Sequence, residues 1–371
     1  MASSSHYSIL FVLAILISAS NAQNGLILPL RKDAKTSQFY TTLELGSNRA
    51  ALTPIIDLGA QFSWFQCDNY VSSTYSPIPC DSRKCEIARG IGCVGCNGPV
   101  RPGCTNDTCG ASAWNPFQGV LVSEGFGEDT LYAKNQRPVS EYTFSCMESR
   151  FMEGLASGAN GLVGLARTEI SLHKQVANKF NLPDSTAPAF TVGDPSDEYF
   201  IDVKSIRVGG ETLSVKNSYF SIDKDGVGGT KISTIQNFTA LHNSIYKPLT
   251  RAFTKAASDM KIKSVAAVEP FRACFSSDSI SRTPAGPSVP TIDLILPGND
   301  IYWRISGANS MVEVDERRMC LAFVDGGSNP RTSVVIGAHQ LEENFLEFDL
   351  VSSQLKFSSS LLVQNQSCSR L

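Results

Sequence analysis

Charge is scarce in this chain, and so is histidine. Charged residues make up 18% of the 371 residues, below the ~25% of a typical soluble domain, and the formal net charge is −3. Basic residues form no tract and do not interleave with aromatic ones, which argues against nucleic acid as a partner. The four histidines show no metal-ligand spacing with acidic residues, so we expect neither a metal nor another cofactor.

Apolar runs long enough to span a bilayer are also missing. Residues 9–17, ILFVLAILI, form a shorter run near the N-terminus, whereas a membrane helix needs ~20 apolar residues. The SASNA that follows has small residues that suit signal-peptide cleavage after Ala22, although no Lys or Arg precedes the apolar core. We therefore predict a signal peptide over residues 1–22 and a secreted, extracellular protein with no membrane partner.

Cysteine, by contrast, is abundant and clustered. The chain has eleven cysteines. Cys93-Val94-Gly95-Cys96 is compatible with a thioredoxin-like or zinc site, but the surrounding cluster contains no histidine and export favours oxidation. Disulfides are therefore the better interpretation, and the odd total indicates an unpaired thiol or a lost partner. The clustered cysteines are Cys67, Cys80, Cys85, Cys93, Cys96, Cys104 and Cys109.

Acceptor sequons for N-glycosylation fit the same compartment. They occur at Asn106, Asn237 and Asn365. Export would expose all three to the glycosylation machinery, so we predict them as glycan sites.

Short strand-like segments dominate the rest of the sequence. GVLVSEGF, TIDLIL, IYWRIS, MVEVD and SVVIG are rich in β-branched and aromatic residues, and Gly, Pro, Asn and Asp separate them. Only two helices stand out, at residues 171–180 and 244–260. The second carries Ile245, Leu249, Phe253 and Ala256 on roughly one face. The sequence predicts a mostly-β protein with few short helices.

The two halves of the chain carry the same order of motifs. Asp57-Leu58-Gly59 is followed far along the chain by GLVG at 161–164, and GTKISTI at 229–235 is followed by SVVIG at 333–337. In each half an apolar strand enters a tight turn, and a later apolar strand ends in glycine. This duplication predicts two similar lobes with a cleft between them, and a boundary within residues 183–195.

These motifs resemble the pepsin-type aspartic protease family. The similarity rests on Asp57-Leu58-Gly59-Ala60, on GLVG and on the C-terminal VVIGAHQLEENFLEFDLVSSQLKFS. The resemblance implies a bilobal pepsin-like aspartic protease fold with two β-barrel-like lobes. We assign residues 23–190 to an N-terminal lobe with the Cys-rich insertion and residues 191–371 to a C-terminal lobe.

The second catalytic carboxylate of that family is missing. Active members carry Asp-Thr-Gly or Asp-Ser-Gly in each lobe, because one carboxyl holds a proton while the other acts as base on water. Asp57 fills the first position, but Ser233 fills the second, and a serine hydroxyl does not ionise near neutral pH. Leu58 replaces the supporting hydroxyl residue, and the β-branch of Ile235 would crowd the turn where glycine is expected. Residues 111–126 also lack the Tyr-Gly pair of a flap, so we predict vestigial dyad positions and no peptidase activity.

No other catalytic set replaces the dyad. His173, His242 and His339 lie in helix-like or turn-like segments, without a Gly-x-Ser-x-Gly or Cys-His arrangement. We interpret them as surface or capping residues.

Within this fold, the chain is most similar to a plant group of extracellular dermal glycoproteins, xylanase and xyloglucanase inhibitors, and basic seed globulins. The matching segments include YVSSTYSPIPCDSRKC, GPSVPTIDLIL, GANSMVEV and VDGGSNPRTSVVIGAHQLEEN. Loss of the second aspartate is typical of this group. The resemblance implies a monomer of the apoplast or cell wall that binds a microbial glycoside hydrolase, a family-twelve xyloglucanase, at its active-site groove.

Arginine side chains are the implied contacts. In the xyloglucanase-inhibiting members an arginine at the position of Arg331 enters the groove of the enzyme, where a planar guanidinium matches two carboxyls ~5–5.5 Å apart. The preceding GGSNP predicts a turn. A second arginine comes from the loop before GPSVP; here that position holds Pro284, and Arg282 lies two residues earlier. We predict Arg331 and Arg282 as inhibitory contacts.

Two other functions stay open: a basic-globulin-like binding or storage protein, and a residual aspartic endopeptidase. The segment between residues 180 and 198 is shorter than the family usually has, where strands of the central sheet and a cysteine are expected. We expect this shortening to account for the odd cysteine count and to leave sheet edges exposed.

Overall fold

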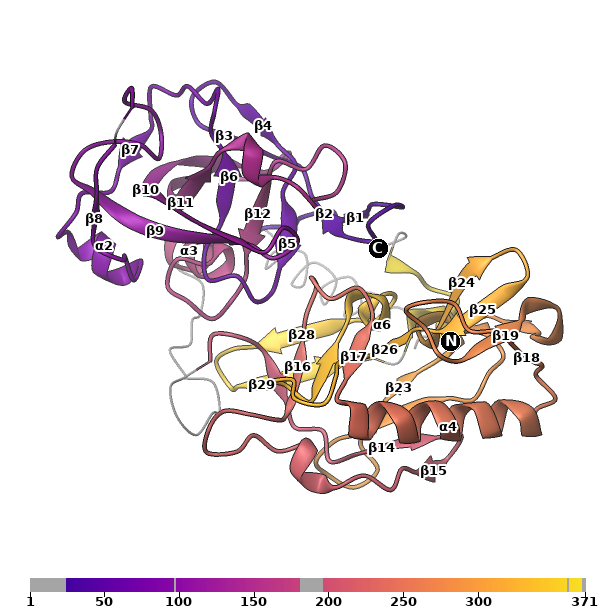
Figure 1. The fold of residues 1–371 in the computed structure, drawn as a ribbon. Coiled ribbons are helices and arrows are strands. Elements are labelled where there is room, and N and C mark those ends of the chain that lie inside the picture. Colours follow the sequence, from indigo (N-terminus) through magenta and orange to yellow (C-terminus); the bar gives the residue numbers. More distant parts are fainter. Residues whose placement is uncertain (1–24, 97, 181–195, 359, 369–371) are drawn as a thin grey trace, which may run out of the picture. The chain divides into compact units, whose positions relative to one another are not determined.

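The computed structural model describes residues 25–96, 98–180, 196–358 and 360–368. Contacts group them into two units (Figure 1). Unit 1 holds the described residues up to Ile56 and those from Gln61 onward in the first half of the chain; unit 2 holds Asp57–Ala60 and the described residues after Ser185. The predicted signal peptide and the predicted boundary within residues 183–195 lie outside the described residues, so the domain limits stay predictions.

Unit 1 is built on a 12-stranded sheet. Its main path runs β1-β2-β5-β12-β6-β11-β10-β3-β4, β7 and β9 pair with β10, and β8 pairs with β9. The alternation of side chains explains these strands: in β3, Leu43 and Leu45 enter the core while Glu44 faces solvent. The strands are β1 (Arg31–Lys32), β2 (Phe39–Tyr40), β3 (Leu43–Leu45), β4 (Ala50–Leu52), β5 (Ile55–Asp57), β6 (Trp64–Gln66), β7 (Ser76–Pro77), β8 (Cys93–Val94), β9 (Thr108–Asn115), β10 (Val120–Tyr132), β11 (Val139–Met147) and β12 (Gly161–Gly164).

Unit 2 contains several smaller sheets. The orders are β13-β16-β27-β17-β26, β15-β14-β22-β23 and β18-β19-β25-β24, and two further pairs are β20-β21 and β28-β29. The strands are β13 (Phe200–Ile201), β14 (Ser205–Val208), β15 (Glu211–Thr212), β16 (Thr230–Ile232), β17 (Thr239–Leu241), β18 (Ser264–Val265), β19 (Cys274–Ser276), β20 (Arg282–Thr283), β21 (Gly286–Pro287), β22 (Ile292–Ile295), β23 (Tyr302–Ile305), β24 (Met311–Asp315), β25 (Arg318–Leu321), β26 (Phe323–Asp325), β27 (Val334–Ile336), β28 (Leu346–Asp349) and β29 (Gln354–Phe357).

The two units repeat one strand order, which confirms the predicted duplication. In unit 1, β5, β12, β6 and β11 are neighbours in that order; in unit 2, β16, β27, β17 and β26 are. The last two strands pair in parallel in both sets. The first strand of each set leads to a predicted dyad position, Asp57 at the end of β5 and Ser233 directly after β16. The motifs that are repeated in the sequence are therefore equivalent strands.

Helices are few, and both predicted ones are present. They are α2 (Arg83–Ile87), α3 (Leu172–Phe180), α4 (Asn243–Asp259), α5 (Gly307–Ser310) and α6 (Ala338–Leu341), with 3₁₀ turns η2 (Ser149–Phe151), η3 (Asn217–Tyr219), η4 (Ser277–Ser279) and η5 (Leu361–Gln364). α4 buries Ile245, Leu249 and Phe253 as its sequence predicts. No helix within the described residues combines the length and apolarity needed to cross a membrane.

Disulfides link ten of the eleven cysteines, which confirms the interpretation of the cluster. The remaining one, Cys368, is a free, exposed thiol. The bonds are Cys67–Cys146, Cys80–Cys93, Cys85–Cys109, Cys96–Cys104 and Cys274–Cys320.

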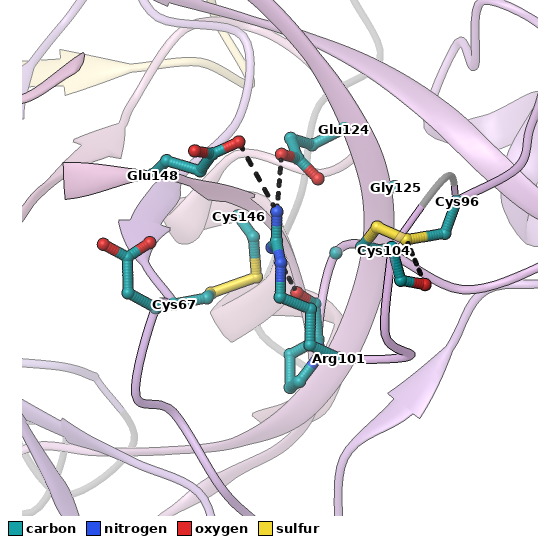
Figure 2. Close-up of polar contacts among 12 residues, drawn as sticks. Cys67, Cys96, Arg101, Cys104, Glu124, Gly125, Cys146 and Glu148 are labelled. Atoms are coloured by element: carbon teal, nitrogen blue, oxygen red, sulfur yellow. Dashed lines mark hydrogen bonds and ion pairs between the residues drawn. A yellow bond between two sulfur atoms is a disulfide. The ribbon is translucent and has the colours of Figure 1, made fainter. Parts of the chain in front are cut away.

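Arg101, in the Cys-rich segment, forms ion pairs with Glu124 and Glu148 of unit 1. Arg101 points between Glu124 of β10 and Glu148, beside the Cys96–Cys104 and Cys67–Cys146 bonds (Figure 2). Its Nη2 lies 3.2 Å from Glu124 Oε1 and 3.6 Å from Glu148 Oε1. Burial raises the pKa of Glu124, and the charge of Arg101 opposes that rise. Arg101 therefore compensates a carboxylate that is only 9% exposed.

Candidate functional site

Asp57 is held by the contacts expected of a dyad carboxylate. It ends β5 and is 9% exposed. The Gly59 N–H donates to Asp57 Oδ1 at 2.7 Å, and the Leu58 N–H donates to Thr234 Oγ1 at 3.1 Å. Leu58, which stands where a supporting hydroxyl is expected, packs its side chain against the core of unit 2. The turn is therefore preserved, but its supporting hydroxyl is replaced by an apolar contact.

A second carboxylate approaches Asp57 from an unexpected position. A Cβ added to Gly59 would lie 3.3 Å from Glu198 Oε1 and 3.4 Å from Asp57 Oδ1, so both carboxylates border the same glycine. Lys231 Nζ donates to Glu198 Oε1 at 2.6 Å. Burial raises the pKa of Asp57 to about 6; the Gly59 N–H opposes the rise, the charge of Glu198 adds to it and that of Lys231 opposes it. Sequence reasoning missed Glu198 and Lys231.

Ser233, at the position predicted for the second aspartate, makes hydrogen bonds that hold its turn. Its N–H donates to Ile336 O at 2.9 Å, and its Oγ accepts from the N–H groups of Ile235 (3.3 Å) and Gln236 (3.2 Å). The expectation that Ile235 crowds this turn is wrong, because the turn forms and Ile235 is not among the residues with positive φ. A hydroxyl can accept these two hydrogen bonds, but it supplies no second ionisable group.

The predicted flap segment is a β-hairpin of β9 and β10. Asn115 Oδ1 accepts from the Phe117 N–H at 2.9 Å, and Gly119, with φ of 72°, closes the turn. Trp114 pairs across the hairpin with Leu121, and the two side chains are 49% and 63% exposed.

His242, His339 and one cysteine–carboxylate group have structural contacts within the described residues. His242 caps α4, accepting from the Ser244 N–H at 3.0 Å, which confirms its interpretation as a capping residue. His339 Nε2 lies 3.0 Å from Met311 O. Cys80, Asp81 and Cys93 lie close enough to share a metal, but the two sulfurs are bonded to each other and are not available as thiolates.

Arg331 stands on an anchored loop between β26 and β27. The Gly327 N–H donates to Asp325 Oδ1 at 2.9 Å, and Gly327 O accepts from the Asn243 N–H at 2.8 Å. Arg331 O accepts from the Gly228 N–H at 2.8 Å, so the backbone is held on both sides of the turn. The Arg331 side chain is exposed and forms no ion pair with any carboxylate of the described residues. The backbone of the Arg331 loop is thus held by hydrogen bonds, while the Arg331 guanidinium has no ion-pair partner among the described residues.

Arg282 lies in a different environment. It begins the short hairpin of β20 and β21, and its side chain is 73% exposed. Its guanidinium forms an ion pair with Glu313 of β24. Among the described residues, Arg282 therefore has an ion-pair partner whereas Arg331 has none.

The sequon asparagines differ in accessibility. Asn106 and Asn365 are exposed. The side-chain oxygen of Asn237 is shielded from solvent.

The pepsin-like fold defines the class: the chain is a homologue of aspartic proteases. The family descriptions "Xylanase inhibitor N-terminal" and "Xylanase inhibitor C-terminal" match residues 39–193 and 198–359. The chain therefore belongs to the xylanase-inhibitor family.

Relatives cover nearly the whole chain. "Probable aspartic proteinase GIP2" of Nicotiana benthamiana is 40% identical over 98% of this chain and 96% of its own length, and gamma conglutin 1 of Prunus dulcis is 33% identical over 99% and 97%. A crystal structure of edgp matches with a TM-score of 0.87 at 38% identity, covering 93% of this chain and 97% of that one. The crystal structure of soybean basic 7S globulin matches with a TM-score of 0.79 at 28% identity, and the match covers 93% of this chain and 97% of that one. The alignment with GIP2 spans 428 positions, so that relative has residues that this chain lacks.

Proposed function

We propose that the protein is a secreted inhibitor of microbial cell-wall-degrading glycoside hydrolases, with a xyloglucan-specific endoglucanase of family twelve as its target, and that it has no peptidase activity. It acts as a monomer in the apoplast or cell wall, and Asn106, Asn237 and Asn365 are its glycan sites, of which Asn106 and Asn365 are exposed. The family description and the disulfides support export and inhibition.

The free guanidinium of Arg331 is the observation that carries the proposal. Retaining glycosidases hold two carboxyls ~5–5.5 Å apart in an open groove, which a planar, doubly donating cation matches. Arg331 is exposed, without an ion-pair partner among the described residues, and its loop is fixed by backbone hydrogen bonds. Binding therefore does not have to break an existing ion pair or order a loose loop, two costs that weaken association.

Arg282 is proposed as a weaker contact. Before it engages an enzyme, its guanidinium has to leave Glu313. An exposed ion pair contributes only ~0–1 kcal/mol, so this exchange is possible, but it lowers the gain from the new contact.

The test is inhibition of xyloglucan hydrolysis by a fungal family-twelve endoglucanase. Wild-type protein, Arg331→Ala and Arg282→Ala are titrated against the enzyme, with Arg317→Ala as the matched control because Arg317 is an exposed arginine that is not one of the two proposed contacts. We expect tight inhibition by wild type and by the control, a loss of about 30-fold or more for Arg331→Ala, as for an interface hot spot of ≥ 2 kcal/mol, and a smaller loss for Arg282→Ala. Equal inhibition by wild type and Arg331→Ala contradicts the proposed role.

A binding or storage function is the second candidate, because relatives named gamma conglutin and basic 7S globulin are 30–33% identical over most of the chain. A protein that unfolds cooperatively but inhibits no xyloglucanase or xylanase supports this candidate. The residual-protease alternative conflicts with Ser233, whose hydroxyl already accepts two N–H groups. Cleavage of denatured globin at acid pH would support the residual-protease alternative.

A further inference from the structure

α4 is the long helix of unit 2 (Figure 1). Its exposed face carries a row of basic side chains. Lys247, Arg251 and Lys255 are exposed and follow each other at four-residue spacing, which places them about 6 Å apart along the helix axis. They lie on the side opposite Ile245 and Leu249, which face the core. We call these three residues the α4 basic stripe.

The α4 basic stripe has no internal counter-charge. Within the described residues, none of its three side chains forms an ion pair, and the only acidic residue of α4 is Asp259. Lys261 and Lys263, just beyond the helix, are exposed and equally without an ion pair there. Many other basic side chains of unit 2 have acidic partners: Lys204, Arg207, Lys231, Arg272, Arg282, Arg304, Arg318 and Lys356.

This concentration of charge is unfavourable for the isolated protein. Like charges four residues apart on a helix repel each other and weaken it slightly. The chain as a whole is acidic, with a net charge of −3, so the stripe is a local feature and does not follow from the overall charge. An external anion with regularly repeated charges would remove the repulsion.

The surroundings of the stripe indicate which anion fits. Five disulfides place the chain in oxidising compartments, which disfavours nucleic acid. A membrane-surface helix presents apolar side chains beside its basic ones, whereas α4 buries its apolar face in the core and flanks the stripe with Ser244 and Ser258. A protein interface needs buried apolar anchors at its centre, and the stripe offers none. A linear, hydrophilic polyanion needs only a straight row of exposed cations.

We propose that the α4 basic stripe binds a linear acidic polysaccharide, a polyuronate, through charge-assisted hydrogen bonds from the two ammonium groups and the guanidinium to successive carboxylates. This activity goes beyond the inhibition of glycoside hydrolases and does not depend on it. It would hold the protein on an acidic wall polymer while the Arg331 loop stays free.

The experiment compares two variants with the same change in net charge. The stripe variant is Lys247→Gln, Arg251→Gln, Lys255→Gln; the control variant is Lys216→Gln, Lys224→Gln, Arg317→Gln, at exposed basic positions elsewhere in unit 2. Glutamine is a good helix former, so α4 is expected to persist. Binding to polygalacturonate, to a neutral xyloglucan oligosaccharide and to phosphatidylserine vesicles is measured at low and high salt.

We expect wild type to bind polygalacturonate but neither the xyloglucan oligosaccharide nor the vesicles. Its affinity for polygalacturonate should fall at high salt. The stripe variant should lose about tenfold in affinity, as for three exposed ion pairs, while the control variant stays close to wild type. Equal losses in both variants, no binding by wild type, or binding only to vesicles overturns the proposal. Hydrogen exchange of wild type provides a readout without substitutions: polygalacturonate should slow exchange in α4, and unchanged exchange there contradicts the proposal. Inhibition by the stripe variant should equal that of wild type, which keeps this test separate from that of the proposed function.

Discussion

Replacing Asp57 with asparagine should change how the stability of the protein depends on pH. In the folded protein the pKa of Asp57 is raised from 3.8 to about 6, chiefly because the carboxyl is buried, with an added contribution from the charge of Glu198. The asparagine side chain keeps an oxygen that can accept from the Gly59 N–H, which lies 2.7 Å from the carboxylate in the wild-type protein. The substitution therefore removes the titration and leaves the turn in place.

The sign follows from proton binding. The folded state holds the Asp57 proton more tightly than the unfolded state does. The stabilisation that protonated Asp57 gives to the folded state is therefore fully present below the ordinary pKa of 3.8, and it is lost as the pH rises through about 6. A shift of roughly two units corresponds to about 3 kcal/mol, since each unit is ~1.4 kcal/mol. Asp57→Asn should thus gain stability relative to wild type as the pH is raised.

Urea unfolding followed by tryptophan fluorescence from acid to neutral pH measures the effect. The control is Asp278→Asn, because Asp278 is exposed. The difference in free energy of unfolding between Asp57→Asn and wild type should grow by up to about 3 kcal/mol between the two pKa values of Asp57. The control variant measures the effect of the same substitution at an exposed position. Parallel pH profiles for wild type and Asp57→Asn would refute the reasoning.

Three further predictions concern buried charge and the free thiol. Arg304→Met removes the guanidinium that donates to both oxygens of Asp293, at 2.7 and 3.0 Å, and leaves that 2% exposed carboxylate poorly compensated. The free energy of unfolding at neutral pH should therefore fall by about 3 kcal/mol. An unchanged urea midpoint would contradict this prediction. Arg101→Met should destabilise unit 1 by about 1–3 kcal/mol, and adding Glu124→Gln should recover part of the loss; additive losses in the double variant would contradict the pairing. The native protein should react with one equivalent of a thiol reagent and the Cys368→Ser variant with none, whereas labelling of that variant would contradict the disulfide assignment.

Much of the fold was predictable because its signals are local and repeated. Alternating apolar segments predicted strands such as β22 and β24, and the spacing of Ile245, Leu249 and Phe253 predicted α4. The duplication was visible because equivalent strands end in equivalent turns. The duplication could be recognised without knowing which strands pair. The structure adds the pairing, which follows a common strand order in the two units.

The surroundings of the dyad positions were not predictable. The tertiary fold alone brings Glu198 to the glycine beside Asp57 and pairs it with Lys231, and an isolated glutamate gives no sequence signal for its partner. The effect of Ile235 was misjudged because a β-branched residue disfavours only a turn that needs positive φ, and this turn does not. The pairing of the clustered cysteines was equally open, since many connectivities satisfy the same spacing. The ion pair of Arg282 also depends on a residue far along the chain, Glu313.

The most direct test of the central claim is a double-mutant cycle between Arg331 and the nucleophilic carboxylate of a family-twelve xyloglucanase. Calorimetry measures the binding of wild type and Arg331→Ala to the native enzyme and to its Glu→Gln nucleophile variant, so that enzyme activity is not needed. If the guanidinium of Arg331 binds that carboxylate, the two substitutions should be coupled by about 1.5 kcal/mol or more, as for other close charge pairs at interfaces. Additive effects of the two substitutions would contradict the account.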